Sequence, residues 1–129
     1  MTVKQISIFL ENRPGQLAKA SRALAENGVN IATLSLADTT DFGIVRMIVD
    51  DHDKGYDVLA KAGFTVRQTE VVMVKVADRP GGMAELMEKL DKAGVDIEYS
   101  YAYALGSGDS AILIFRFNDN AKAEAALGA

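Results

Sequence analysis

The chain of 129 residues has no cysteine, no tryptophan and a single histidine, His52. The absence of cysteine excludes a disulfide framework, a CxxC metal site and a thiol nucleophile. His52 lies between Asp51 and Asp53, and no second histidine or cysteine stands at metal-ligand spacing, so we predict neither a metal site nor a cofactor. A cysteine-free chain suits the reducing cytoplasm, and we expect a cytoplasmic protein.

Basic charge and long apolar runs are also lacking. The formal net charge is −4, whereas nucleic acids and anionic membranes attract basic patches. No apolar run approaches the roughly 20 residues that a transmembrane helix needs, and no signal-peptide pattern is present. We therefore predict no nucleic-acid and no membrane partner. Apolar residues make up 49% of the chain and charged residues 25%, which is typical of a globular domain.

One stretch of the sequence occurs twice, at residues 10–17 and again 66 residues later. Each copy begins where alternating apolar residues, typical of a strand, give way to the three-to-four spacing of an amphipathic helix. A repeat of this length indicates a duplicated domain, because solenoid units have periods of roughly 20–50 residues. The two copies are Leu10-Glu11-Asn12-Arg13-Pro14-Gly15-Gln16-Leu17 and Val76-Ala77-Asp78-Arg79-Pro80-Gly81-Gly82-Met83, followed at the same shift by Gly28-Val29-Asn30-Ile31 and Gly94-Val95-Asp96-Ile97.

The turn in each copy has the chemistry of an anion site. Pro14 suits the first position of a helix, because its missing N–H would have no intrahelical acceptor there. Gly15 has no side chain, so a ligand can approach its backbone closely. The first N–H groups of a helix lack internal acceptors and carry partial positive charge. With Pro80 and Gly81 in the second copy, the sequence predicts two candidate sites for a carboxylate or phosphate.

The first copy is predicted to fold as strand, helix, strand, strand, helix, strand, and the second copy is predicted to repeat this order without the last strand. This is the ferredoxin-like α+β arrangement, an antiparallel sheet with both helices on one face. In the first domain, residues 1–70, we expect strands at 3–10, 30–37, 44–49 and 64–70 and helices at 14–27 and 53–62. In the second domain, residues 71–129, we expect strands at 71–77, 97–105 and 111–117 and helices at 80–93 and from 120 onward.

The given sequence ends without a counterpart of residues 64–70, the last strand of the first domain, so either the second copy lacks this strand or the sequence is truncated before it. A missing strand would leave an open sheet edge, which proteins usually pair or cover. Domains of this size are marginally stable alone. We therefore expect a homodimer, with a partner chain as one cover for that edge. Residues 64–77 contain neither glycine nor proline, so the last strand of the first domain should run directly into the first strand of the second.

The duplicated motifs resemble the ACT domain, a small regulatory module of amino-acid metabolism, and most of all the serine-sensing module of bacterial phosphoglycerate dehydrogenases. The two matches cover nearly the whole chain, so the resemblance is to tandem ACT proteins. It implies that a free amino acid binds at an interface between two ACT domains. The implied ligand contacts are a polar residue before the Pro-Gly pair, the turn glycine, and the residues where the first helix meets the second strand.

Carried over position by position, the resemblance implies unequal sites in the two copies. The first copy has neutral Asn12 and Asn30, whereas the second has Asp78 and Asp96, which would repel a carboxylate. The serine-sensing members carry a histidine two places before the first of these positions. Here that place is apolar, with Leu10 in the first copy and Val76 in the second. The resemblance therefore implies either a branched-chain or a serine-like amino acid as the ligand. The implied ligand-binding residues are Leu10, Asn12, Pro14, Gly15, Gln16, Leu17, Asn30 and Ile31 in the first copy, and Val76, Asp78, Gly81, Gly82, Met83, Asp96 and Ile97 in the second.

The leading interpretation is a non-catalytic regulatory protein that senses an amino acid, because the sequence contains no catalytic Ser/His/Asp set. A second is a trans-acting subunit of an amino-acid biosynthetic enzyme, of the acetohydroxyacid synthase small-subunit type. A third is a small enzyme on the same fold, of the acylphosphatase type, for which Arg13 with Asn12 or Asn30 would have to hold a phosphate. Fold alone does not choose between them. A copurifying enzyme would support the second, and turnover of acetyl phosphate the third.

Overall fold

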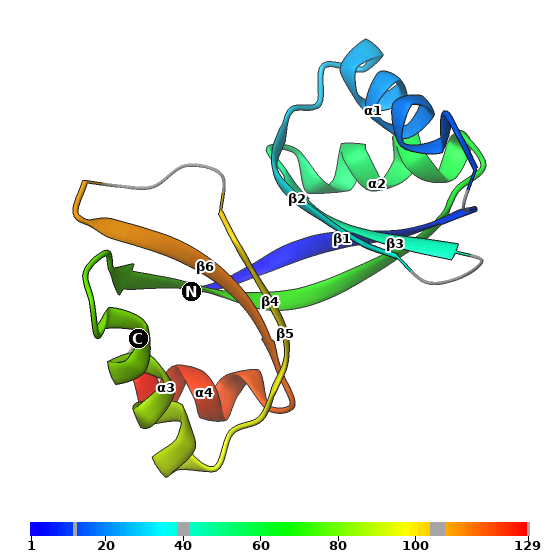
Figure 1. Cartoon of the computed structure of the whole chain (residues 1–129). Helices are drawn as coiled ribbons and strands as arrows, with labels where there is room; N and C mark the ends of the chain where they lie inside the picture. The colour runs from blue at the N-terminus through cyan, green and yellow to red at the C-terminus, as the bar shows by residue number, and fades with distance from the viewer. Residues whose placement is uncertain (12, 39–41, 104–107, 129) are drawn as a thin grey trace. The chain divides into compact units, whose positions relative to one another are not determined.

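The structure of the chain is a computed structural model that describes residues 1–11, 13–38, 42–103 and 108–128. The chain divides into two compact units (Figure 1). The first unit is Lys4–Thr69, and the second unit combines Met1–Val3 with Glu70–Ala129. Within the described ranges, no helix is both long and apolar enough to cross a membrane.

The first unit has the predicted ferredoxin-like order of elements. Its strands are hydrogen-bonded in the order β2-β3-β1-β4, and the β1–β3 and β2–β3 pairs are antiparallel. Both helices lie on one face of these strands (Figure 1). The side chains of Ile6, Ile8 and Leu24 are fully buried in the core between the helices and the sheet. The elements are β1 (Thr2–Glu11), α1 (Gln16–Glu26), β2 (Ile31–Asp38), β3 (Phe42–Val49), α2 (His52–Lys61) and β4 (Thr65–Ala77).

The second unit repeats this plan with the later half of β4 as its first strand. β6 pairs antiparallel with both β4 and β5, and the core contains Phe115 and Phe117 with their rings stacked 5.2 Å apart. As predicted, β4 is one unbroken strand of 13 residues. The further elements are α3 (Gly82–Ala93), β5 (Ile97–Ala102), β6 (Ser110–Phe117) and α4 (Asn120–Leu127).

The predicted starts of two helices are wrong by two residues. Gly15 and Gly81 have φ angles of +89° and +88°, so the chain turns left-handed there and α1 and α3 begin one residue later. Pro14 and Pro80 therefore lie in the turns before the helices. In neither turn does the N-cap residue accept a hydrogen bond through its side chain, since both are glycines. The first N–H groups of α1 and α3 therefore have no side-chain acceptor at the N-cap.

The first residues of the given sequence pair with β4 in the second unit. The Met73 N–H donates to the Met1 carbonyl at 2.8 Å, and the Met1 ammonium donates to the Met73 carbonyl at 3.2 Å. The Thr2 hydroxyl also donates to the carboxylate of Glu124 in α4. The sequence analysis placed these residues in the first domain and left the edge for a partner chain. Met1–Val3 instead pair with this edge for a short distance.

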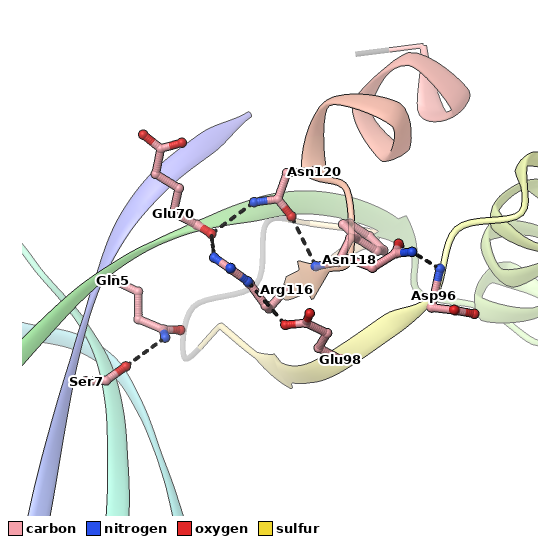
Figure 2. Close-up of polar contacts among 9 residues, drawn as sticks. Gln5, Ser7, Glu70, Asp96, Glu98, Arg116, Asn118 and Asn120 are labelled. Carbon is pink, nitrogen blue, oxygen red and sulfur yellow. Dashed lines mark hydrogen bonds and ion pairs between the residues drawn. The ribbon is translucent and has the colours of Figure 1, made fainter.

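A polar cluster ends the β4–β6 pairing in the second unit (Figure 2). The Asn120 amide accepts from the Phe117 N–H at 3.1 Å and donates to the Glu70 carbonyl at 3.0 Å. The Arg116 guanidinium donates to the same carbonyl at 3.1 Å and pairs with Glu98 at 3.3 Å. The Asn120 side chain thus bridges two backbone groups that lie beyond the last paired residues of the ladder.

Replacing Asn120 with alanine is expected to lower the free energy of unfolding of the second unit by about 1–2 kcal/mol, because the part-buried Phe117 N–H loses its acceptor. Urea denaturation followed by circular dichroism measures the change. Asn27→Ala is the matched control, since it removes an exposed hydrogen bond from a side-chain amide to a carbonyl and should cost less than about 0.5 kcal/mol. Equal losses in the two variants would contradict this role of Asn120.

Candidate functional site

The turn between β1 and α1 borders a cavity of about 190 Å³ in the first unit. The antiparallel register sets Gly43 opposite Leu10, which brings the start of β3 beside the end of β1. A Cβ atom added to Gly15 would meet nothing within 4 Å, so the backbone of the turn is open to a ligand. The lining residues are Leu10, Glu11, Arg13, Gly15, Gln16, Leu17, Ala18, Leu36 and Gly43.

The structure brings together four of the predicted site residues of the first copy, Leu10, Gly15, Gln16 and Leu17. Asn12 lies outside the described residues, and Pro14 is exposed in the turn without lining the cavity. Asn30 and Ile31 lie past the opposite end of α1, whose 11 residues at 1.5 Å each span roughly 16 Å. One copy of the unit therefore does not hold both halves of the predicted site within reach of one small ligand.

The backbone around Asn30 is fixed while its side chain is exposed. The Asn30 N–H donates to the Asp50 carboxylate at 2.9 Å, and the Asp50 N–H donates to the Asn30 carbonyl at 3.0 Å. Asp96 and Asn118 form the same pair in the second unit, at 3.1 Å in both directions. Amide and carboxylate have changed places between the units, so the exposed group at the end of the helix is neutral in the first and an acid in the second.

The turn between β4 and α3 is built more tightly than its counterpart. The Gly82 N–H donates to the Arg79 carbonyl at 3.0 Å, and a Cβ atom on Gly82 would lie 2.1 Å from the Ala77 carbonyl oxygen. The cavity beside this turn is about 150 Å³ and includes Val76 and Gly82 among its lining residues. The other predicted residues of the second copy, Asp78, Gly81, Met83, Asp96 and Ile97, are exposed and do not line it.

The first turn has one more positive charge nearby than the second. In the second unit the Arg79 guanidinium donates to both carboxylate oxygens of Glu85 at 2.9 Å and to the Pro80 carbonyl at 3.2 Å. The residue in the place of Glu85 is Lys19 in the first unit, where its ammonium lies 5.2 Å from the centre of the Phe64 ring. Arg13 pairs with Glu11 at 2.9 Å. The first turn therefore suits an anion better than the second.

Five residues that line the first cavity were missed by the sequence analysis, namely Glu11, Arg13, Ala18, Leu36 and Gly43. Leu36 and Gly43 line the first cavity although they lie far from the motif in sequence. The predicted topology could have indicated them, because a strand that pairs antiparallel with the first strand begins beside the end of that strand. Arg13 was considered only as a phosphate ligand in the acylphosphatase alternative, and its place on the cavity depends on the conformation of the turn.

Comparisons with known proteins show the family and the fold. A family model described as an ACT domain pair matches residues 1–127. The crystal structure of protein BT0572 from Bacteroides thetaiotaomicron is similar to 99% of this chain and 88% of that chain, with 38% identity and a TM-score of 0.93. The regulatory subunit of aspartate kinase from Thermus thermophilus, in its ligand-free form, shares 20% identity over 98% of this chain and 93% of that chain, with a TM-score of 0.71. No protein with a curated description matches.

Proposed function

Since the chain belongs to the family of ACT domain pairs, we propose that it is a non-catalytic regulatory protein that senses a free amino acid. The observation that carries the proposal is the cavity at the first turn, where open backbone and apolar side chains meet. A free amino acid presents a carboxylate, an ammonium and one side chain. Amides at the start of a helix suit the carboxylate, and apolar walls suit an aliphatic side chain.

The ligand that the first cavity fits best is an amino acid with a branched aliphatic side chain. The apolar walls of the cavity are buried Leu10, half-buried Leu17 and Leu36, which is 52% exposed, and its polar lining is Glu11, Arg13 and Gln16. A polar ligand side chain would lose its water there without gaining a hydrogen bond from these walls. The volume of about 190 Å³ is below the usual range of about 300–1,000 Å³ for drug-sized ligands, which supports a ligand of amino-acid size.

The second half of the site is proposed to come from a second copy of the chain. Asn30 is exposed, and it is separated from its own Gly15 by the length of α1. The Asn30 amide can both donate to a carboxylate and accept from an ammonium. A ligand held by both copies would bind only the assembled state and would stabilise it, which is how binding could be passed on to a partner enzyme of amino-acid biosynthesis.

A thermal-shift screen of the twenty free amino acids tests the proposal directly. A ligand at about 100 times its dissociation constant stabilises the folded chain by roughly 2.7 kcal/mol, which is a shift of several degrees. We expect leucine, isoleucine or valine to give the largest shift. A flat response to all twenty would refute amino-acid sensing. A largest shift with aspartate or glutamate would refute the aliphatic ligand while leaving sensing in place.

Replacing Asn30 with alanine is expected to weaken binding of L-leucine by about tenfold, because one hydrogen bond to a charged ligand group is lost. Asp96→Ala is the matched control at the equivalent position of the second unit, and it should change the affinity by less than about twofold. Isothermal titration calorimetry measures both variants. A larger loss for Asp96→Ala would assign the ligand to the second unit instead.

A further inference from the structure

Asn27 and Gly28 connect the end of α1 to the segment that leads into β2. Asn27 is the C-cap of α1, and it is the one asparagine of the sequence that a glycine follows. Asparagine is thermally labile, and a following glycine has no side chain to keep its backbone nitrogen away from the asparagine side chain. The equivalent pair in the second unit is Ala93 and Gly94. The first unit therefore has a reactive amide where the second has a methyl group.

The turn that contains this pair is closed by backbone hydrogen bonds of the Schellman type. The Gly28 N–H donates to the Ala25 carbonyl at 3.1 Å, and the Val29 N–H donates to the Leu24 carbonyl at 3.0 Å. Gly28 has a φ angle of +72°, the left-handed conformation typical of this motif. The side chains of Val29 and Leu24 are buried in one core cluster, which supplies the apolar contact of the motif. Burial of Val29 therefore keeps the turn closed.

The Asn27 side chain is exposed, and within the described part of the chain one hydrogen bond holds it. Its Nδ2 donates to the Ala23 carbonyl at 2.8 Å. A cavity of about 440 Å³ between α1 and α2 includes Asn27 in its lining and is wide enough to admit water to the amide. A Cβ atom added to Gly28 would meet nothing within 4 Å. The hydrogen bond of the Gly28 N–H to Ala25 is therefore the main restraint on a reaction between Gly28 and Asn27.

We propose that Asn27 is a site of spontaneous deamidation whose rate is set by the opening of this turn. In the open turn the Gly28 nitrogen attacks Cγ of Asn27, and the amide group leaves as ammonia with the proton of the Gly28 N–H. The product is a five-membered succinimide ring. Water then opens the ring at either carbonyl, which gives aspartate or isoaspartate. In the closed turn the Gly28 N–H is directed to the Ala25 carbonyl and not to Asn27, and helix ends open more readily than the core does.

Either product replaces a neutral amide with a carboxylate at the end of α1. The C-terminus of a helix carries partial negative charge, so a carboxylate is unfavourable there. The cavity beside Asn27 is lined by two acids, Glu26 and Asp57, and two lysines, Lys54 and Lys61, so the added charge makes a balanced set net negative. Isoaspartate also lengthens the backbone by one atom. Deamidation therefore changes the charge and the length of the segment that leads to Asn30.

Peptide mapping by mass spectrometry tests the site on the full chain, kept folded at mildly alkaline pH and physiological temperature. Trypsin releases residues 23–46, which compare Asn27 and Asn30 within one fragment. We expect conversion at Asn27 and not at Asn30, with isoaspartate among the products. Asn27→Gln keeps an amide on a longer side chain, which does not form the five-membered ring, and should show no conversion. Conversion of another asparagine before Asn27 would overturn the assignment of the site.

A matched pair of variants tests whether the turn controls the rate. Val29→Ala loosens the turn and should speed conversion at least about tenfold. Val95→Ala makes the same change in the same motif of the second unit and should leave the rate within about twofold of the wild type. Low urea concentrations, below the unfolding transition, make the same test on the wild-type chain, where conversion should rise together with hydrogen exchange of the Gly28 amide. Conversion that ignores both Val29→Ala and urea would overturn control by the turn.

The effect on the candidate site rests on the proposed function, whereas the modification does not. Chain converted at Asn27 should bind L-leucine about fivefold more weakly than fresh chain, because isoaspartate lengthens the backbone before Asn30. Asn27→Asp adds the charge without the length and should bind within about twofold of the wild type. Equal affinities of converted and fresh chain would refute the effect of the modification on binding. Absence of leucine binding by the fresh chain would refute the sensing function alone.

Discussion

Replacing Gly82 with alanine is expected to lower the free energy of unfolding of the second unit by about 3 kcal/mol. The added Cβ would lie 2.1 Å from the Ala77 carbonyl oxygen and 3.1 Å from its carbon. Both atoms belong to the backbone, so no side chain can rotate away to make room. The first turn of α3 must move instead, which breaks the hydrogen bond from the Gly82 N–H to the Arg79 carbonyl.

The matched control is Gln16→Ala at the equivalent position of the first unit. A Cβ atom is already present there, so this substitution should change stability by less than about 0.5 kcal/mol. Thermal unfolding separates the two variants, since a loss of 3 kcal/mol corresponds to roughly 12–24 °C in a domain of this size. Hydrogen exchange then locates the loss in the second unit. A melting temperature for Gly82→Ala within about 3 °C of the wild type would show that the turn can relax at little cost.

The order of elements could be predicted from the sequence because each signal was local. Alternating Val72, Val74 and Val76 predicted a strand, and the spacing of Leu86 and Leu90 predicted a helix, and the structure contains both. The helix starts were misplaced because the left-handed conformation of Gly15 and Gly81 depends on how each turn packs. Proline alone gave no indication of it.

The candidate site was harder to predict than the fold, because its parts are distant in sequence. The motif identified Gly15 and Leu17, but the walls formed by Leu36 and Gly43 follow from strand register. The pairing of Met1 with Met73 was not predicted either. A strand supplied from the opposite end of the chain leaves no local pattern, and a three-residue segment is too short to show alternation.

Replacing Lys19 with glutamate is expected to weaken binding of L-leucine about thirtyfold, which corresponds to roughly 2 kcal/mol. The substitution gives the first turn the charge that Glu85 gives the second. Glu85 holds the Arg79 guanidinium through two bonds of 2.9 Å, and a glutamate at position 19 can hold Arg13 in the same way. Arg13 is already paired with Glu11 at 2.9 Å, so the ligand carboxylate would lose chiefly the attraction of Lys19 and would meet a new negative charge.

A graded series separates charge from packing in this prediction. Lys19→Gln removes the cation without adding an anion, so its affinity should fall between those of the wild type and Lys19→Glu, about fivefold below the wild type. Lys54→Glu makes the same charge change at an exposed position away from the turn and should have less than about a twofold effect. The differences in affinity between these variants should become smaller in 0.5 M salt, because screening weakens the interactions of exposed charges. Equal affinities of Lys19→Gln and Lys19→Glu would mean that Lys19 acts through its contact with Phe64 and not through its charge.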